Sequence, residues 1–242
     1  MTSYDLLLQN ISHRDTPLSL RTWQNYQEWH DTVLFHFEVP KEALEELIPK
    51  ELILDTFENK AWISIICYYV KNSHERNFFR IPFISNFTEL NIRTYVKYNG
   101  LKATYLLSPN RDLLRSTIYS KLIHGLSYKL SEIERTGNLL DYDDRSENRI
   151  YVKYFKKENK SYTPNSIDQW LTERYSRFYN ENNNLFKVDI HHSKWKLRKM
   201  EIIPIKIKAY VNKILLLDDC YPTLSHFGEK LEVLSWAKKR II

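Results

Sequence analysis

Glycine is scarce in this sequence, with only four among 242 residues. A phosphate-binding loop needs a glycine-rich run so that backbone amides can surround the phosphates, and the nucleophile elbow of a serine hydrolase needs the pattern G-x-S-x-G. Neither pattern occurs in the chain. The sequence therefore argues against a nucleotide-binding protein and against a serine hydrolase.

Cysteines are few, and long apolar runs are absent. Cys67 and Cys220 form no metal-binding or redox spacing, and no stretch approaches the roughly 18 to 20 apolar residues of a membrane helix. Residues 1–10 lack the basic region, apolar core and cleavage site of a secretory signal. We therefore expect a soluble protein of the reducing cytoplasm, with no membrane partner.

Three histidines, His191, His192 and His226, are the remaining candidates for a metal site. Neighbours on a strand point to opposite faces, so His191 and His192 cannot both ligate one ion in regular β geometry. No other metal-binding spacing accompanies them. We expect no metal and no cofactor, and a packed or hydrogen-bonded histidine beside Trp195.

The formal net charge is +6, and the excess lies in the second half of the chain. Residues 1–120 hold 13 Lys and Arg against 14 Asp and Glu, whereas residues 121–242 hold 23 against 16. A nucleic-acid interface would gather such charge on one face beside exposed aromatic side chains. Because Lys, Asn, Ile and Tyr are abundant throughout the chain, nucleic-acid or partner binding is the least favoured hypothesis. The sequence gives no sign of oligomeric state, so a homo-oligomer stays open.

Residues 1–242 are expected to form a single domain. No linker rich in Pro, Ser or Gly divides the chain, and no internal repeat is present. The short Asn-rich run at residues 180–184 is typical of a loop tip. Apolar residues make up 43% of the chain, which is ample for a core.

Strand patterns dominate the sequence. Residues 61–70 are apolar at almost every position, which predicts a strand buried on both faces. Asn99-Gly100 predicts a tight hairpin between strands at residues 87–96 and 102–107, and Pro109-Asn110 is expected to end the second of these. Further strands are expected at residues 32–39, 151–155, 185–190, 195–203, parts of 206–217, and 231–236.

Helical patterns are fewer, at residues 41–48, 112–123 and 167–174. The longest of these has apolar residues at helical spacing, with Gly125 beyond it as a terminator. Many strands with two or three inserted helices predict a mainly β (α+β) protein. The expected architecture is an antiparallel β-barrel or a strongly curved sheet.

The strand at residues 87–96 has one polar face. Its alternation places Glu89, Asn91 and Arg93 on one side and apolar residues such as Leu90 and Ile92 on the other. A solvent-facing strand favours β-branched residues, Lys or Thr, so these three side chains suggest a polar interior that holds a ligand. The alternatives are a solvated outer face and an internal salt bridge between Glu89 and an Arg of another strand.

A second polar group follows the last expected helix. Residues 172–175 combine an acid, a guanidinium and a phenol in the order Thr-Glu-Arg-Tyr. Such a group can orient a bound carboxylate or form a structural ion pair. The structural interpretation is favoured over the ligand-binding one.

Six ordered motifs resemble the YqjF-like family of uncharacterised bacterial proteins, and together they span most of the chain. They lie at residues 29–40 (WHDTVLFHFEVP), 52–57 with 61–62, 87–96 (FTELNIRTYV), 171–175 (LTERY), 191–195 (HHSKW) and 225–227 (SHF). The family is related in fold to acetoacetate decarboxylase. The resemblance therefore implies a cone-shaped antiparallel β-barrel around a small polar pocket.

In acetoacetate decarboxylase, a lysine made reactive by an adjacent lysine forms a Schiff base with a β-keto acid. Residues 124–131 resemble the Gly-x-Pro-Lys-Lys segment of that enzyme, and the match places Tyr128 at the Schiff-base lysine and Lys129 at the second. A phenol cannot form an imine, so a Schiff-base decarboxylase is not expected, although Lys129 alone could act as a cation or nucleophile. This chain also has Ser108-Pro109-Asn110 where relatives have Ser-Leu-Asp, so a carboxylate is lost there.

The first functional hypothesis is a cytoplasmic protein that binds a small organic anion in a polar β-barrel interior. Arg93 would pair with the charge of the ligand, because a guanidinium holds carboxylates in a fixed geometry. Glu89 and Asn91 would orient the ligand. His36 or His192 would support the site.

The second hypothesis is a lyase or another acid/base enzyme that acts on an oxo acid. Lys129 or Glu89 would be the catalytic group, and Arg93 would hold the carboxylate of the substrate. The third hypothesis is the nucleic-acid-binding or interaction protein considered above. The sequence does not identify the substrate.

Overall fold

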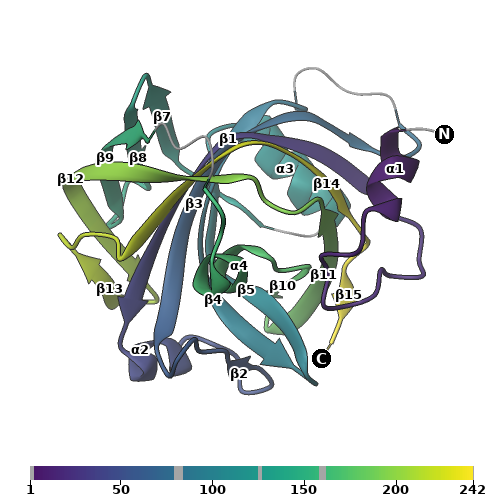
Figure 1. Ribbon diagram of the computed structural model, residues 1–242, viewed down its shortest axis with the longest axis horizontal. Coiled ribbons are helices and arrows are strands. Elements are labelled where there is room, and N and C mark those ends of the chain that lie inside the picture. The colour runs from purple at the N-terminus through teal and green to yellow at the C-terminus, as the bar shows by residue number, and fades with distance from the viewer. Residues whose placement is uncertain (1–2, 79–83, 125–126, 158–161, 242) are drawn as a thin grey trace.

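A computed structural model describes residues 3–78, 84–124, 127–157 and 162–241 (Figure 1). The helices in this part of the chain are α1 (Ser3–Gln9), α2 (Lys41–Glu45), α3 (Leu114–His124) and α4 (Ser166–Thr172). None of them is both long and apolar enough to span a membrane.

The strands of the described residues belong to one sheet. They are β1 (Asn25–Val39), β2 (Ile53–Leu54), β3 (Ala61–Glu75), β4 (Phe87–Tyr98), β5 (Leu101–Arg111), β6 (Lys129–Leu130), β7 (Glu132–Thr136), β8 (Leu139–Asp143), β9 (Arg149–Lys156), β10 (Ser176–Glu181), β11 (Asn184–His192), β12 (Leu197–Val211), β13 (Ile214–Asp218), β14 (Leu224–Ser235) and β15 (Lys239–Arg240).

The sheet is strongly curved, as the sequence predicted. β1 pairs antiparallel with both β14 and β3, and the order continues through β4 and β5 to β10 and β11. β11 pairs with β14 as well, so the far strands return to the starting ones. Among the strands of the described residues, only the pairings of β10 with β5 and of β6 with β5 are parallel.

Both faces of β1 are buried from Thr32 to Phe37, and both faces of β3 from Ala61 to Tyr68. Phe35 and Ile65 belong to a core on the outer face of the curve, where β7, β8, β9 and part of β12 cover the sheet (Figure 1). Leu34, Ile66 and Tyr68 belong to a second core on the inner face. This confirms the expectation that the apolar strand beginning at residue 61 has no solvent-facing side.

The hairpin between β4 and β5 forms as predicted. Tyr98 pairs with Leu101, and Asn99 and Gly100 adopt φ angles of 48° and 79° in a two-residue turn. The expectation that Pro109-Asn110 ends the second strand is wrong, because β5 continues to Arg111. Near this end only the two-residue strand β6 borders β5 on one side, so a residue without an amide proton is tolerated there.

The three expected helices are confirmed as α2, α3 and α4, and α1 is an addition that the sequence did not predict. In α3 the apolar side chains of Leu114 and Ile118 are about half exposed, whereas Ser116 and Ser120 are buried. The polar side of α3 thus faces the interior. Its expected terminator, Gly125, lies outside the described residues.

Gly228 gives a test of packing on the inner face. A Cβ atom at this position in β14 would lie 2.8 Å from Cζ3 and 3.0 Å from Cε3 of the buried Trp195 ring. We therefore expect Gly228→Ala to lower the free energy of unfolding by about 1–3 kcal/mol in urea denaturation. Trp195→Phe in the same background should recover part of this loss, because the smaller ring removes the clash. A Gly228→Ala protein as stable as the parent would contradict this packing.

Candidate functional site

A buried carboxylate, Glu89, lies at the centre of the inner face. Its Oε1 accepts hydrogen bonds from the hydroxyl of Tyr68 at 2.7 Å, from Nδ2 of Asn91 at 2.9 Å and from the hydroxyl of Tyr128 at 3.3 Å. Its Oε2 accepts one from Nε of Arg111 at 3.0 Å. Glu89 and Arg111 are direct cross-strand partners on β4 and β5, so the internal salt bridge considered from the sequence is present.

Glu89 is held in its ionised form. Burial alone would raise its pKa, but the charges of Arg111 and Arg177 and the hydrogen bonds from Tyr68 and Asn91 lower the pKa below its usual value. For Arg177 the directions are reversed. Burial alone would lower its pKa, but the neighbouring Tyr128 and Glu89 raise the pKa above its usual value. The carboxylate is therefore a fixed negative charge with several donors, which differs from the raised pKa expected of a general base at neutral pH.

A small inner cavity of about 30 Å³ adjoins this cluster. Asn91 and Arg93 of β4 line it together with Arg174 and Arg177, and Trp195 is part of its apolar wall. Four polar atoms of these residues are buried without a hydrogen-bond partner among the described residues. They are Nε of Arg93, Nη2 of Arg174, Nε of Arg177 and Oδ1 of Asn91.

Two of these arginines are also anchored to the protein. Nη1 of Arg174 lies 2.7 Å from Oδ2 of Asp55, and both side chains are 2% exposed, so the group at residues 172–175 forms the structural ion pair favoured above. Nη2 of Arg93 donates to the carbonyl oxygen of Leu171 in α4 at 3.2 Å. Their remaining nitrogens are thus held in place at the cavity, because the side chains cannot swing away freely.

The two candidate histidines occupy different places. His192 lines the inner cavity, and its Nδ1 lies 2.8 Å from the carbonyl oxygen of Ser193. Burial lowers the pKa of His192 to about 4, which keeps it neutral. His36 lies deeper, hydrogen-bonded through Nδ1 to Oγ of Ser64 at 2.6 Å, and Ser64 is in turn bonded to the hydroxyl of Tyr95.

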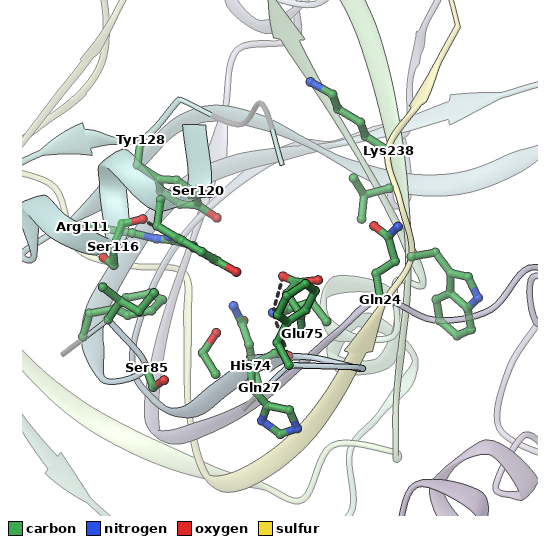
Figure 2. A pocket seen from close by; sticks show the side chains of 18 of the residues that line it. Gln24, Gln27, His74, Glu75, Ser85, Arg111, Ser116, Ser120, Tyr128 and Lys238 are labelled. Atoms are coloured by element: carbon green, nitrogen blue, oxygen red, sulfur yellow. Dashed lines mark hydrogen bonds between the residues drawn. The ribbon is translucent and has the colours of Figure 1, made fainter. Parts of the chain in front are cut away.

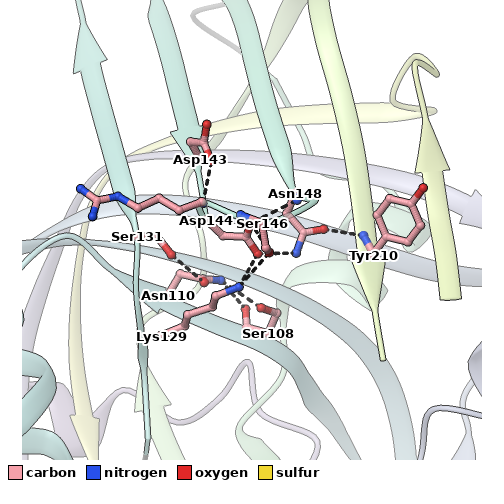
Figure 3. Close-up of polar contacts among 10 residues, drawn as sticks. Ser108, Asn110, Lys129, Ser131, Asp143, Asp144, Ser146, Asn148 and Tyr210 are labelled. Atoms are coloured by element: carbon pink, nitrogen blue, oxygen red, sulfur yellow. Dashed lines mark hydrogen bonds and ion pairs between the residues drawn. The ribbon is translucent and has the colours of Figure 1, made fainter. Parts of the chain in front are cut away.

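Lys129 lies away from the inner cavity, although its neighbour Tyr128 contacts Glu89. In Figure 3 its ammonium group points to the turn between β8 and β9, and Nζ lies 2.6 Å from Oδ2 of Asp144. The Lys129 side chain is 47% exposed. Asn110, where the family resemblance implies an acid, is buried beside this group and uses its amide both to donate to Ser108 and to accept from Ser131. A carboxylate could not make both contacts.

A larger outer cavity of about 440 Å³ lies on the other side of the Glu89 cluster. Figure 2 shows Arg111, Ser120 and Tyr128 on one side of it and Gln24 and Lys238 on the opposite side. The buried serines of α3 belong to its lining, which explains why α3 turns its polar side inward. Arg177 lines both cavities.

Sequence reasoning missed Tyr68, Arg111 and Arg177 as parts of the site. Arg177 lies between the buried residues Ser176 and Phe178 in β10, so it is a charged residue within a largely buried strand. A polar residue between buried ones was the signal for Arg177 in the sequence. The sequence did not show that β10 pairs with β5, which brings Arg177 to the site. Among the described residues, no three His, Cys, Asp or Glu side chains gather in a group that could hold a metal ion. The arginine nitrogens that lack a partner at the inner cavity are suited to anion binding by guanidinium groups.

Glu89→Gln tests the electrostatic role of the central carboxylate. The substitution keeps the shape but leaves Arg111 and Arg177 without their nearest buried anion, so we expect a loss of about 3–5 kcal/mol in the free energy of unfolding, measured in urea. The matched control is Glu132→Gln, because Glu132 pairs with Arg145 on the exposed surface. That variant should lose less than about 1 kcal/mol. Equal losses in the two variants would show that the buried pair is not special.

Three buried histidines predict how stability depends on pH. Burial lowers the pKa of His191 and His192 to about 4 and that of His36 well below its usual value. The unfolded chain, with histidine pKa values near ~6.5, therefore binds more protons than the folded chain below that pH. We expect the unfolding free energy to be at its plateau above pH ~6.5 and to fall as the pH drops towards 4, measured by denaturation at several pH values.

The variant His191→Gln isolates one contribution to this pH dependence. It removes a titrating group whose Nε2 lies 2.7 Å from the carbonyl oxygen of Leu7, so the slope of stability against pH between ~6.5 and 4 should become shallower. Carboxylates such as Glu28 and Asp144, whose pKa values are lowered to about 2, contribute mainly at lower pH. An unchanged slope in the variant would rule out His191 as a source.

The amino-acid sequence is similar to a family of uncharacterised proteins. Residues 26–230 match DUF2071, a family described as an uncharacterised conserved protein. The uncharacterised protein YqjF of Bacillus subtilis (strain 168) is 30% identical over 226 residues, which cover 90% of this chain and 93% of that protein. The family match includes the whole of β4.

Solved structures with similar folds include acetoacetate decarboxylases and an enduracididine biosynthesis enzyme. Acetoacetate decarboxylase of Legionella pneumophila has a TM-score of 0.59 at 14% identity, with 98% of this chain and 95% of that chain covered. The enduracididine biosynthesis enzyme MppR complexed with pyruvate has a TM-score of 0.58 at 8% identity, with 94% and 93% covered. At these identities the likeness shows the fold alone. By its sequence match, and with an acetoacetate decarboxylase-like fold, the chain belongs to the DUF2071 family that includes YqjF.

Proposed function

We propose that the protein binds a small organic anion, a carboxylate in particular, at the inner cavity. The observation that carries this proposal is the excess of buried positive charge with free donors. Arg93, Arg174 and Arg177 line the cavity, and each has a buried nitrogen without a partner among the described residues. A buried donor that loses water without gaining an acceptor costs free energy, and a bound carboxylate would supply the acceptors.

The charge balance supports an anion rather than a cation. Arg111 is paired with Glu89, and Arg174 is paired with Asp55, which also lies 2.7 Å from Nζ of Lys97. Among the described residues no carboxylate forms an ion pair with Arg93, and the negative charge that acts on Arg177 is that of Glu89, which Arg111 already neutralises. A further negative charge is therefore favourable, and the low local dielectric strengthens its attraction.

Each candidate residue has a role in this proposal. Arg93 and Arg177 donate to the carboxylate, and Glu89 fixes Asn91, whose free Oδ1 accepts a hydroxyl or amine hydrogen from the ligand. His192 forms part of the wall as a neutral imidazole. His36 supports the site indirectly, through Ser64 and Tyr95, behind the cavity.

An oxo-acid lyase is the second candidate, because the structural neighbours include MppR complexed with pyruvate. The pyruvate complex of that enzyme is consistent with a carboxylate ligand here. In this chain no lysine among the described residues lines the inner cavity, and Tyr128 donates to Glu89 at the position that the family resemblance assigns to the imine-forming lysine. Binding is therefore the better supported proposal.

Arg93→Gln tests the proposal. Isothermal titration calorimetry with acetate, pyruvate and inorganic phosphate should detect saturable binding to the parent protein, and Arg93→Gln should weaken it about tenfold or more, because a hydrogen bond to a charged group is lost. The uncharged acetamide should not bind.

The matched control is Arg198→Gln, since Arg198 is on β12 and forms an exposed ion pair with Glu229. Its affinity for the anions should stay within twofold of the parent value. Absence of saturable binding for every anion, or equal weakening in the two variants, would refute the proposal.

A further inference from the structure

The inner and outer cavities differ greatly in size. The inner cavity of about 30 Å³ has room for a few water-sized groups, since each water needs roughly 10–15 Å³ by this measure. The outer cavity of about 440 Å³ falls within the usual range for sites that bind larger organic ligands. A two-carbon or three-carbon acid would occupy the inner cavity and leave the outer one to solvent.

The two cavities meet at the Glu89 cluster. Arg177 lines both of them. Tyr68 reaches Glu89 from the side of the inner cavity, while Arg111 and Tyr128 reach it from the outer one. Arg177 is therefore the side chain through which a ligand held in one cavity can contact the other.

The outer cavity offers flat apolar surfaces near this junction. The Arg111 guanidinium lies 4.2 Å from the ring centroid of Phe87 and 3.5 Å from that of Tyr128, so it contacts both rings, and these three side chains line the cavity together as an aromatic floor. Tyr179, Val188 and other apolar side chains continue the lining. Towards the mouth the lining becomes polar, with Gln24 exposed and aimed at the space (Figure 2).

We propose that the ligand of this site is a carboxylic acid with a ring-sized apolar body, the carboxylate at Arg177 and Arg93 and the body in the outer cavity. This inference rests on the proposed function and adds the substrate class. Burial of the body against the aromatic floor supplies affinity, and the guanidinium groups fix the orientation. The acid thus differs in size from the pyruvate seen in MppR.

The test compares acids that share a head group and differ in their body. Acetate, pyruvate, phenylpyruvate and 4-phenylbutyrate are titrated into the full chain by calorimetry, with 4-phenylbutyramide as the uncharged match. We expect the phenyl acids to bind at least about tenfold more tightly than acetate and pyruvate, because binding transfers the apolar phenyl ring from water into the outer cavity. The amide should bind at least about tenfold more weakly than its acid.

Gln24→Trp adds a steric test within the same protein. A large ring at this exposed position narrows the outer cavity without entering the core, so it should weaken the phenyl acids at least tenfold and leave acetate within twofold. The control is Gln9→Trp, because Gln9 is exposed on α1 and is not part of either cavity lining. It should change neither class of ligand.

The outcomes separate this inference from the proposed function. If acetate and pyruvate bind and lose affinity in Arg93→Gln, but the phenyl acids bind no better, the anion site stands and the ring-sized body is wrong. If the amide binds as well as the acid, the outer cavity takes apolar molecules without the arginines, and the inference is also overturned. If no acid binds at all, both proposals fail together.

Discussion

The buried ion pair between Glu89 and Arg111 is the interaction on which the polar interior of the curved sheet depends. Glu89 is buried, and a lone carboxylate in such a place would either take up a proton or destabilise the fold. Arg111 on the neighbouring strand, two tyrosine hydroxyls and Asn91 satisfy it instead. Because these donors come from β3, β4, β5 and the segment before β6, the cluster also ties together the strands that form one wall of both cavities.

The need to pair Glu89 also determines which side chains remain able to bind a ligand. With Glu89 saturated by donors, the chemistry of the interior shifts to the arginines that have free nitrogens. Arg174 is positioned by Asp55, and Arg93 by the carbonyl of Leu171 in α4, so α4 serves as a support for the proposed anion site. A preorganised set of donors binds an anion with little further loss of side-chain entropy, which is a general advantage of rigid sites.

Much of the fold could be predicted from the sequence because its signals are local. The Asn99-Gly100 turn, the apolar strand at 61–70 and the helix near residue 114 depend on residues that are close in the chain. The predicted end of β5 at Pro109 failed because the cost of a proline depends on the neighbouring strand, which is distant in sequence. α1 was not predicted, since its only buried apolar side chain is Leu7.

The sequence by itself determined that Glu89, Asn91 and Arg93 share one strand face, because alternation in a strand depends only on the backbone. Only the tertiary structure decided that Arg111 pairs with Glu89, that Arg177 arrives from a strand parallel to β5, and that Lys129 points to Asp144 and away from the cavity. The alternation of side chains predicts which residues of one strand lie on the same face. Which residues of other strands lie beside them depends on pairing between strands that are distant in the sequence. Burial and charge pairing then select among the arrangements that the local pattern allows.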